Sequence, residues 1–332
     1  MSTLRLDRTT GSWAVLAPRR SARPHTALAM ERSPLPERDP TCPFCPGNEE
    51  ETPPEIARYP DGARWNVRVV PNLFAALGSE TGNGHATTQG VFQEIPGAGS
   101  HEVIVESPRH DARLDELEEH DVVRVVETWR ARTRDLTARP EIRGVVVFKN
   151  FGPLAGTSLV HTHSQIIATS VALPAIERRV DVATRFRDEQ GGCVYETLLE
   201  EERARAVRVV DEADGFTVLA PFASASPYET WIVPREHRSA FADLGDDCVE
   251  QLARALIRSV RAIRRACDDP DYNLMIMSAD GEDSSDAFHW FVRIVPKLTT
   301  PAGFELASGM SINTVAPEDA AAALRSALEP IA

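Results

Sequence analysis

Hydrophobic and polar positions follow the same order twice along this chain. The segment 102–117 (EVIVESPRHDARLDEL) resembles the segment 229–244 (ETWIVPREHRSAFADL), and Glu102 aligns with Glu229 at an offset of 127 positions. A repeat of this length indicates that one folding unit occurs twice.

Each copy continues with a helical pattern and then with two β-forming runs. Apolar residues recur at helical spacing, in the first copy at Val122, Val125, Trp129 and Leu136, and in the second at Val249, Leu252, Leu256 and Ile263. This spacing predicts one amphipathic helix in each copy. The predicted strands are 66–71, 144–150 and a run from His161 in the first copy, and 216–221, 273–278 and a run from His289 in the second.

The predicted fold class is α+β, because strand, strand, helix, strand, strand within one unit gives mostly antiparallel pairing. We expect a tandem pair of such units with antiparallel sheets, crossing helices and a pseudo-two-fold arrangement. The expected boundaries are a first unit at residues 1–171, a linker at 172–205 and a second unit at 206–332.

The two copies differ most at the last strand. The first copy reads HTHSQ from His161 onward, whereas the second reads HWFVR at 289–293. Since alternate residues of a strand face one side, His161, His163 and Gln165 form one polar row. A single histidine in a strand is usually structural, but this row follows a glycine-bearing loop at 150–158 whose backbone N–H groups could approach a phosphate. The pattern therefore indicates a site in the first copy.

Composition narrows the possible partners. The chain has 332 residues, 42% of them hydrophobic, and a net charge of -14 without a long basic block. That charge argues against nucleic acid as a main partner, whereas a small anionic substrate needs only a local cluster of cations. No run of apolar residues has the length of a membrane span, and the N-terminus MSTLRLDRTT lacks the apolar core of a signal peptide. We expect a cytoplasmic protein with no membrane partner.

Cysteine usage points to one local site. Five cysteines in a chain of this length do not make a disulfide framework, but Cys42 and Cys45 form a C-x-x-C within CPFCPGNEEETPPE. That motif leaves metal binding and redox chemistry open. Cys193, Cys248 and Cys267 have no motif around them and are expected to be ordinary thiols.

Together, these motifs resemble the galactose-1-phosphate uridylyltransferase family, the transferase branch of the histidine triad superfamily. The resemblance covers nearly the whole chain. The matching pieces, which are specific in their combined order, are 13–24, 42–55, 71–74, 107–110, 150–165, 227–237 and 302–305. The resemblance implies a histidine-triad-like fold for each of the two units.

The resemblance implies a double displacement at His163. This histidine would attack the α-phosphorus of a nucleotide sugar, release a sugar 1-phosphate and pass the nucleotidyl group to a second sugar 1-phosphate. An imidazole suits this role because it is partly neutral near pH 7 and nucleophilic. Its other nitrogen needs a fixed acceptor, which the family takes from a backbone carbonyl before the strand. Gln165 stands where hydrolytic relatives carry a third histidine, and an amide cannot donate a proton as an acid, so the intermediate should wait for an acceptor.

The resemblance also implies one structural zinc ion. The family's ligands match Cys42, Cys45, His110 and His161. Two thiolates and two imidazoles are typical of structural zinc, and the C-x-x-C lacks the following helix of a thioredoxin-type redox motif. The alternative is a member that has lost its metal. A second metal site of the family uses two histidines where this chain has His289 and then Phe291, so we expect that site to be empty.

Substrate-binding residues follow from the same resemblance. Arg20 and Arg23 match arginines that reach the nucleotide phosphates, the latter from a partner subunit, and a guanidinium fork suits phosphate oxygens. The remaining matches are Asn72 and Asn150 near the nucleotide, Ser158 at a phosphate, and Phe304 with Glu305 at the sugar. Family members are commonly homodimers, so we expect a homodimer.

The leading functional hypothesis is exchange of a UMP group between UDP-glucose and galactose 1-phosphate. Two positions depart from the family pattern. Thr162 stands where proline is frequent, and Leu73 with Phe74 follows Asn72 where many uridylyltransferases carry an acidic residue in the second position. The base therefore stays open. One alternative is an ADP-sugar phosphorylase or adenylyltransferase on the same site, and another is a zinc-stabilised nucleotide-binding protein without turnover.

Overall fold

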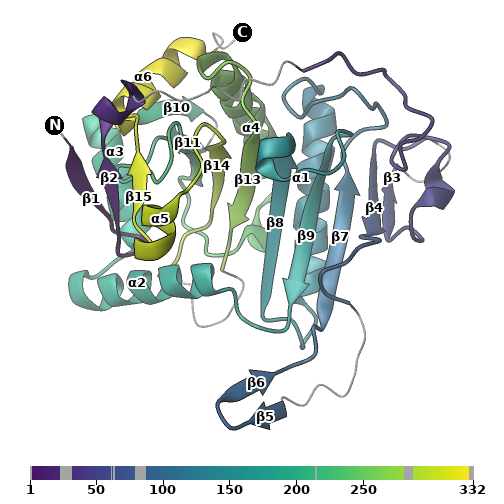
Figure 1. Cartoon of the computed structure of the whole chain (residues 1–332), viewed down its shortest axis with the longest axis horizontal. Helices are drawn as coiled ribbons and strands as arrows, with labels where there is room; N and C mark the ends of the chain where they lie inside the picture. Colours follow the sequence, from purple (N-terminus) through teal and green to yellow (C-terminus); the bar gives the residue numbers. More distant parts are fainter. Residues whose placement is uncertain are drawn as a thin grey trace.

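A ten-stranded antiparallel sheet forms the centre of the described part of the chain, which in this computed structural model comprises residues 2–22, 32–60, 62, 64–78, 87–213, 215–279 and 287–328 (Figure 1). The strand order is β10-β11-β12-β14-β13-β8-β9-β7-β4-β3. The first half contributes β3 (Ala57–Tyr59), β4 (Val67–Pro71), β7 (Gly99–Val105), β8 (Gly144–Phe151) and β9 (His163–Thr169). The second half contributes β10 (Val209–Ala213), β11 (Phe216–Leu219), β12 (Thr230–Pro234), β13 (Tyr272–Met277) and β14 (Phe291–Pro296).

The two halves of this sheet are arranged as a pseudo-two-fold pair about the junction between β8 and β13. At the junction Tyr272 pairs with Phe151 and Met275 with Phe148, in antiparallel register. Each half repeats the same order of strands outward from this line. The α+β class and the repeat are thus confirmed, and the two expected sheets are joined into one because each unit satisfies the open backbone edge of the other.

The helices predicted from periodicity lie at the repeated position. They are α1 (Glu119–Thr137) and α4 (Asp246–Ala266), which pack against each other on one face of the sheet. The predicted apolar positions are all buried in both helices. Trp129 of α1 also reaches the sheet, where its Nε1 donates a 2.7 Å hydrogen bond to Ser164 of β9.

Segments outside the repeat close the second half of the sheet. The expected linker at 172–205 contains two helices, α2 (Pro174–Gln190) and α3 (Val194–Arg205). The beginning and end of the chain meet, since β2 (Ser12–Leu16) pairs with both β1 (Thr3–Asp7) and β15 (Ser311–Asn313). Beside them are α5 (Gly303–Ser308) and α6 (Pro317–Ala327). Residues near the start of the expected first unit therefore pack with residues of the expected second unit.

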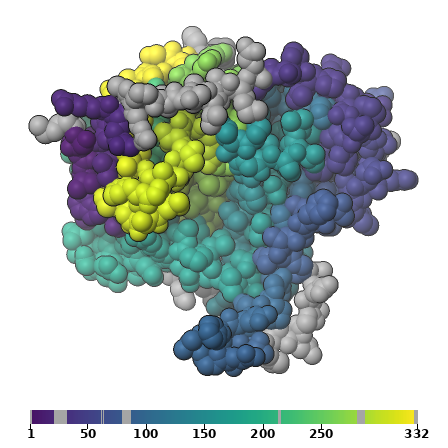
Figure 2. Space-filling view, viewed as in Figure 1, coloured from purple at the N-terminus to yellow at the C-terminus, as the bar shows by residue number. Residues whose placement is uncertain are grey.

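The remaining elements are short. They are the 3-10 helices η1 (Pro18–Ala22), η2 (Glu49–Glu51), η3 (Pro153–Ala155) and η4 (Phe241–Asp243), and the strands β5 (Thr87–Gln89) and β6 (Phe92–Glu94). The hairpin of β5 and β6 projects from the body of the molecule (Figures 1 and 2). Among the described residues, no helix combines the length and apolar character needed to cross a bilayer.

Candidate active site and metal centre

Two residues of the predicted polar row, His163 and Gln165, lie on β9, between β7 and β8, whereas His161 precedes the strand, which begins two residues later than predicted. His163 is the first residue of this strand and is 6% exposed. Gln165 lies on the same face, and its Oε1 accepts a 2.8 Å hydrogen bond from His101 Nε2 and a 3.4 Å hydrogen bond from Asn72 Nδ2. The structure thus brings Asn72 next to Gln165.

His101 is a member of this row that the sequence analysis missed. It lies on β7, where Val103 pairs with Gln165 and Val105 with His163, so alternate β7 residues share the face of the row. The sequence could have indicated this position, because residues 101, 103 and 105 alternate along one strand and therefore share one face of it. It was missed because the repeat placed the start of that strand at Glu102.

A hydrogen bond to the backbone fixes the orientation of the His163 ring. Its Nδ1 lies 2.8 Å from the carbonyl oxygen of His161, and only a protonated Nδ1 can donate to that acceptor. The Nε2 lone pair is therefore free to attack. Burial lowers the pKa of His163, although the bond to the carbonyl opposes the shift. The ring is consequently neutral and nucleophilic near pH 7.

Four buried donor side chains meet next to this histidine. One ligand atom from each of Cys42, Cys45, His110 and His161 lies within 4.8 Å of the others. Cys45 Sγ is 3.5 Å from His110 Nδ1 and 3.7 Å from His161 Nδ1. His161 Nε2 donates a 2.7 Å hydrogen bond to the Ser107 carbonyl, which leaves its Nδ1 for a metal.

The chemistry of these donors fits a metal ion such as zinc. Two sulfurs and two imidazole nitrogens are the set that structural zinc sites use. Burial raises the pKa of the Cys42 thiol to about 11, so its thiolate needs a neighbouring cation. The four residues implied by resemblance are thus brought together in a group that could hold a metal.

The donor group and His163 share contacts. His161 offers its Nδ1 to the donor group and its carbonyl oxygen to His163. Phe44, between the two cysteines in sequence, places its ring 6.0 Å from the His161 ring and 5.5 Å from the His163 ring. A bound metal would therefore hold the segment whose carbonyl oxygen orients the His163 ring.

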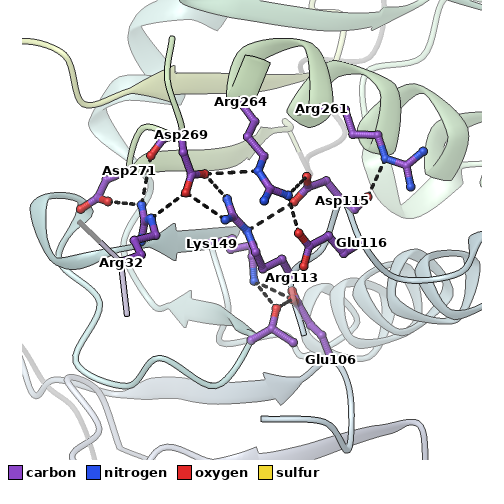
Figure 3. A network of polar contacts seen from close by, with 11 residues as sticks. Arg32, Glu106, Arg113, Asp115, Glu116, Lys149, Arg261, Arg264, Asp269 and Asp271 are labelled. Carbon is purple, nitrogen blue, oxygen red and sulfur yellow. Dashed lines mark hydrogen bonds and ion pairs between the residues drawn. The ribbon is translucent and has the colours of Figure 1, made fainter. Parts of the chain in front are cut away.

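A buried polar network contacts the chain at the start of β9 (Figure 3). Lys149 of β8 places its Nζ 2.6 Å from Glu106, 2.9 Å from Thr162 Oγ1 and 3.0 Å from the carbonyl oxygen of His163. Thr162 donates from its hydroxyl to Glu106 Oε2 at 2.7 Å. The threonine that replaces the frequent proline is therefore part of a hydrogen-bonded network that also contacts the backbone of His163.

The glycine-bearing loop joins β8 to β9 beside this network. Asn150, at the end of β8, accepts a 2.8 Å hydrogen bond from Asn273 of the second half, and Ser158 is exposed further along the loop. Gly152 and Gly156 have φ values of 85° and 90°, a region that favours glycine. The two residues predicted to contact the substrate, Asn150 and Ser158, therefore lie on a loop whose backbone conformation depends on its glycines.

Two other residues predicted to contact the substrate, Phe304 and Glu305, lie on an element apart from β9 in a single chain. Arg20 is exposed on η1, while Phe304 and Glu305 belong to α5, beside β15 and well to the left of β9 in Figure 1. Glu305 accepts a 3.0 Å hydrogen bond from the backbone N–H of Ala302 at the start of its own helix. Arg23 lies outside the described residues.

A second group of donor side chains lies in the other half of the chain. Cys193, Glu196 and His237 each bring a ligand atom within 4.8 Å of the others, and the His289 ring lies 5.1 Å from the His237 ring. His289 Nε2 is buried without a hydrogen-bond partner among the described residues. The prediction of an empty second site considered only histidines, and the structure adds a cysteine and a glutamate. Its emptiness stays a prediction.

A buried histidine with a fixed ring, beside four donors that could hold a metal ion in a duplicated α+β sheet, fits an enzyme that transfers nucleotidyl groups. Residues 1–172 match the family described as galactose-1-phosphate uridyl transferase, N-terminal domain. The chain belongs to the galactose-1-phosphate uridylyltransferase family.

Relatives with different names match this chain. It is 35% identical to an ADP-glucose phosphorylase of Arabidopsis thaliana, over 97% of this chain and 92% of that protein. It is 27% identical to a galactose-1-phosphate uridylyltransferase of Thermotoga maritima, over 98% of both. A crystal structure of an ADP-glucose phosphorylase from Arabidopsis thaliana with bound ADP-glucose superposes with a TM-score of 0.86, at 34% identity and over 98% of both chains.

Proposed function

We propose that this enzyme moves a nucleotidyl group from a nucleotide sugar to a phosphate acceptor through a covalent bond to His163. The observation that carries the proposal is the fixed, neutral ring, whose Nδ1 donates a hydrogen bond to the His161 carbonyl oxygen, so that Nε2 is unprotonated. Nε2 attacks the α-phosphorus, and the bond to the bridging oxygen breaks, so that sugar 1-phosphate leaves with the electron pair. An acceptor phosphate oxygen then attacks the α-phosphorus, and Nε2 recovers its lone pair.

We propose that ADP-glucose is the donor and inorganic phosphate the acceptor, the alternative left open by the sequence. The support is the ADP-glucose phosphorylase of Arabidopsis thaliana, at 35% identity across almost the full length of both chains. With this donor the first step yields an adenylyl-histidine and glucose 1-phosphate, and the second yields ADP. Leu73 and Phe74, exposed beside Asn72, offer apolar surface next to the row.

Exchange of UMP between UDP-glucose and galactose 1-phosphate is the second candidate, and it was the leading one from the sequence. The match to the family's N-terminal domain and the relative in Thermotoga maritima favour it. Both candidates use the same attack by His163. They differ in the base bound near Asn72 and in the acceptor.

The resident metal of the four-donor group is proposed to be zinc, held by Cys42, Cys45, His110 and His161. Zinc bound there would cross-link the loop around Cys42 to the segment before β9. Its role is to fix structure, since four protein donors leave no open position for substrate.

We propose a homodimer, as expected from the resemblance. Phe304 and Glu305 lie on α5, apart from β9 within one chain, so as substrate ligands they would have to act across a subunit interface. Arg23 is expected from the partner subunit on the resemblance alone. Light scattering that shows a pure monomer would remove these residues from the proposed site.

The proposal is tested by intact-protein mass after incubation with ADP-glucose or UDP-glucose, without an acceptor. We expect an adenylyl adduct that maps to His163, and no adduct on a His163→Ala variant. A uridylyl adduct would select the second candidate. No adduct with either donor, together with nucleotide binding that His163→Ala retains, would instead support the non-catalytic nucleotide-binding protein.

The lifetime of the adduct tests the role of Gln165. The amide has no acidic proton to give, so the adduct should persist in water until a phosphate acceptor is added. A Gln165→His variant should lose its adduct faster in buffer, because an imidazolium can protonate a leaving group. Equal lifetimes would show that Gln165 does not limit hydrolysis.

A further inference from the structure

The glycine-bearing loop at 150–158 is contacted by residues from the other half of the chain. This loop starts at the end of β8 and leads to the histidine row. Its neighbour across the sheet junction is the start of β13, where Tyr272 pairs with Phe151 and Asn273 with Asn150. Three successive residues, 271–273, each touch the loop through their side chains.

Asp271 contacts the loop at its tightest point. Its Oδ2 accepts a 2.5 Å hydrogen bond from the backbone N–H of Leu154. Its other oxygen lies against Gly152, where an added Cβ would be 2.1 Å from Oδ1. The carboxylate thus occupies the space that a side chain at residue 152 would need, and it ties down one N–H of the loop.

Asn273 and Tyr272 contact the loop on either side of this point. Asn273 Nδ2 donates to Asn150 Oδ1 at 2.8 Å and to the carbonyl oxygen of Ala155 at 2.9 Å. The Tyr272 ring stacks on Phe151 with centroids 5.0 Å apart and planes 22° apart. One amide therefore fixes both the side chain proposed to contact the nucleotide and the backbone three residues past Gly152.

The carboxylate of Asp271 is itself held in place (Figure 3). Arg32 donates to its Oδ1 at 2.5 Å and also pairs with Asp269 at 3.1 Å. Asp269 is further paired with Arg113 and Arg264. Because Arg32 holds the carboxylate of Asp271 in position, this side chain is a rigid hydrogen-bond acceptor for the loop.

We propose that Asp271 and Asn273 are positioning residues that hold the loop at 150–158 in the shape needed to receive the phosphate groups of the substrate. The second half of the chain lacks the histidine row, and through these two residues it contributes to the site of the first half. This inference rests on the proposed function, in which the loop meets a phosphate-bearing nucleotide.

The test uses the full-length, zinc-loaded protein with substitutions at residue 271. Asp271→Leu removes both hydrogen bonds with little change in volume, while Asp271→Asn keeps one carbonyl oxygen for the Leu154 N–H. The matched control is Asp211→Leu, on β10 at the far edge of the sheet. Asp211 is also ion-paired, with Arg258 at 2.7 Å, and its side chain is 11% exposed against 9% for Asp271.

Hydrogen–deuterium exchange of the loop is measured first, because it needs no turnover. We expect the amide of Leu154 to exchange at least about tenfold faster in Asp271→Leu than in Asp211→Leu, since the acceptor that it has among the described residues is gone, and to stay protected in Asp271→Asn. Equal loop exchange in Asp271→Leu and Asp211→Leu would overturn the positioning role, whether or not the enzyme is active.

Adduct formation is measured next, as a function of donor concentration. For Asp271→Leu and Asn273→Leu we expect the KM for the donor to rise about tenfold or more, while Asp271→Asn and Asp211→Leu stay near the unsubstituted protein. Faster loop exchange with an unchanged KM and rate would also overturn the proposal. If the unsubstituted protein forms no adduct with any donor, the proposed function fails, and the exchange data still decide whether residue 271 holds the loop.

Discussion

Replacing Lys149 by methionine should destabilise this protein more than a typical core substitution. Lys149 and Glu106 are both 1% exposed, and Glu106 Oε1 has no hydrogen-bond partner among the described residues. The ammonium is therefore the main compensation for a buried carboxylate, with one further hydrogen bond from Thr162. Methionine fills the same volume and leaves the carboxylate uncompensated, for which the expected loss is about 3–5 kcal/mol.

The assay is urea unfolding of the zinc-loaded protein, with free energies extrapolated to water. The matched control is the double variant Lys149→Met with Glu106→Leu, which removes both charges together. Because a buried pair replaced by apolar residues is often close to neutral, the double variant should recover most of the loss. A single variant that loses less than about 1 kcal/mol, or a double variant that loses as much as the single one, would refute this reasoning.

Three further outcomes are expected. Metal analysis should find one zinc ion per chain and none in Cys45→Ala, and a second ion lost on Cys193→Ala would contradict the predicted empty site. Gly152→Ala should lose about 2 kcal/mol or more, since its Cβ would meet a carboxylate oxygen, whereas Gly90→Ala, also at positive φ but with open surroundings, should lose less. Burial alone would raise the pKa of Glu229, but its arginine partner and hydrogen bonds lower the pKa below the usual 4.5. The free energy of unfolding should therefore fall as the pH drops below about 4.5. In Glu229→Gln it should fall less steeply.

Local sequence patterns predicted the repeated core because apolar residues at helical or strand spacing lie on one face of the element, and that face is buried. The apolar positions of α1 and α4, such as Trp129 and Leu256, are buried as their spacing indicated. The strands of both copies were also recognisable. Joining of the two sheets at β8 and β13 was not predicted, because a pairing between segments more than a hundred residues apart leaves no mark in either segment alone.

The residues of the candidate site were likewise only partly predictable from the sequence. The four donor residues and the fixed ring of His163 follow from motifs that the resemblance supplied, and the structure brings them together. His101, Glu106 and Asp271 reach the site through contacts that only the folded chain creates. The helices at 172–205 were missed because they have no counterpart in the repeat to draw attention to them.

The junction between β8 and β13 also bears on how the chain can be divided. Either half expressed alone would leave the junction edge of a central strand unpaired, at 148–151 of β8 or at 272–275 of β13. Such an edge recruits other strands, so an isolated half should self-associate or aggregate instead of standing as a small independent protein. A protease cut between the halves, by contrast, should leave them bound together, and the nicked chain should run as one particle until it is denatured.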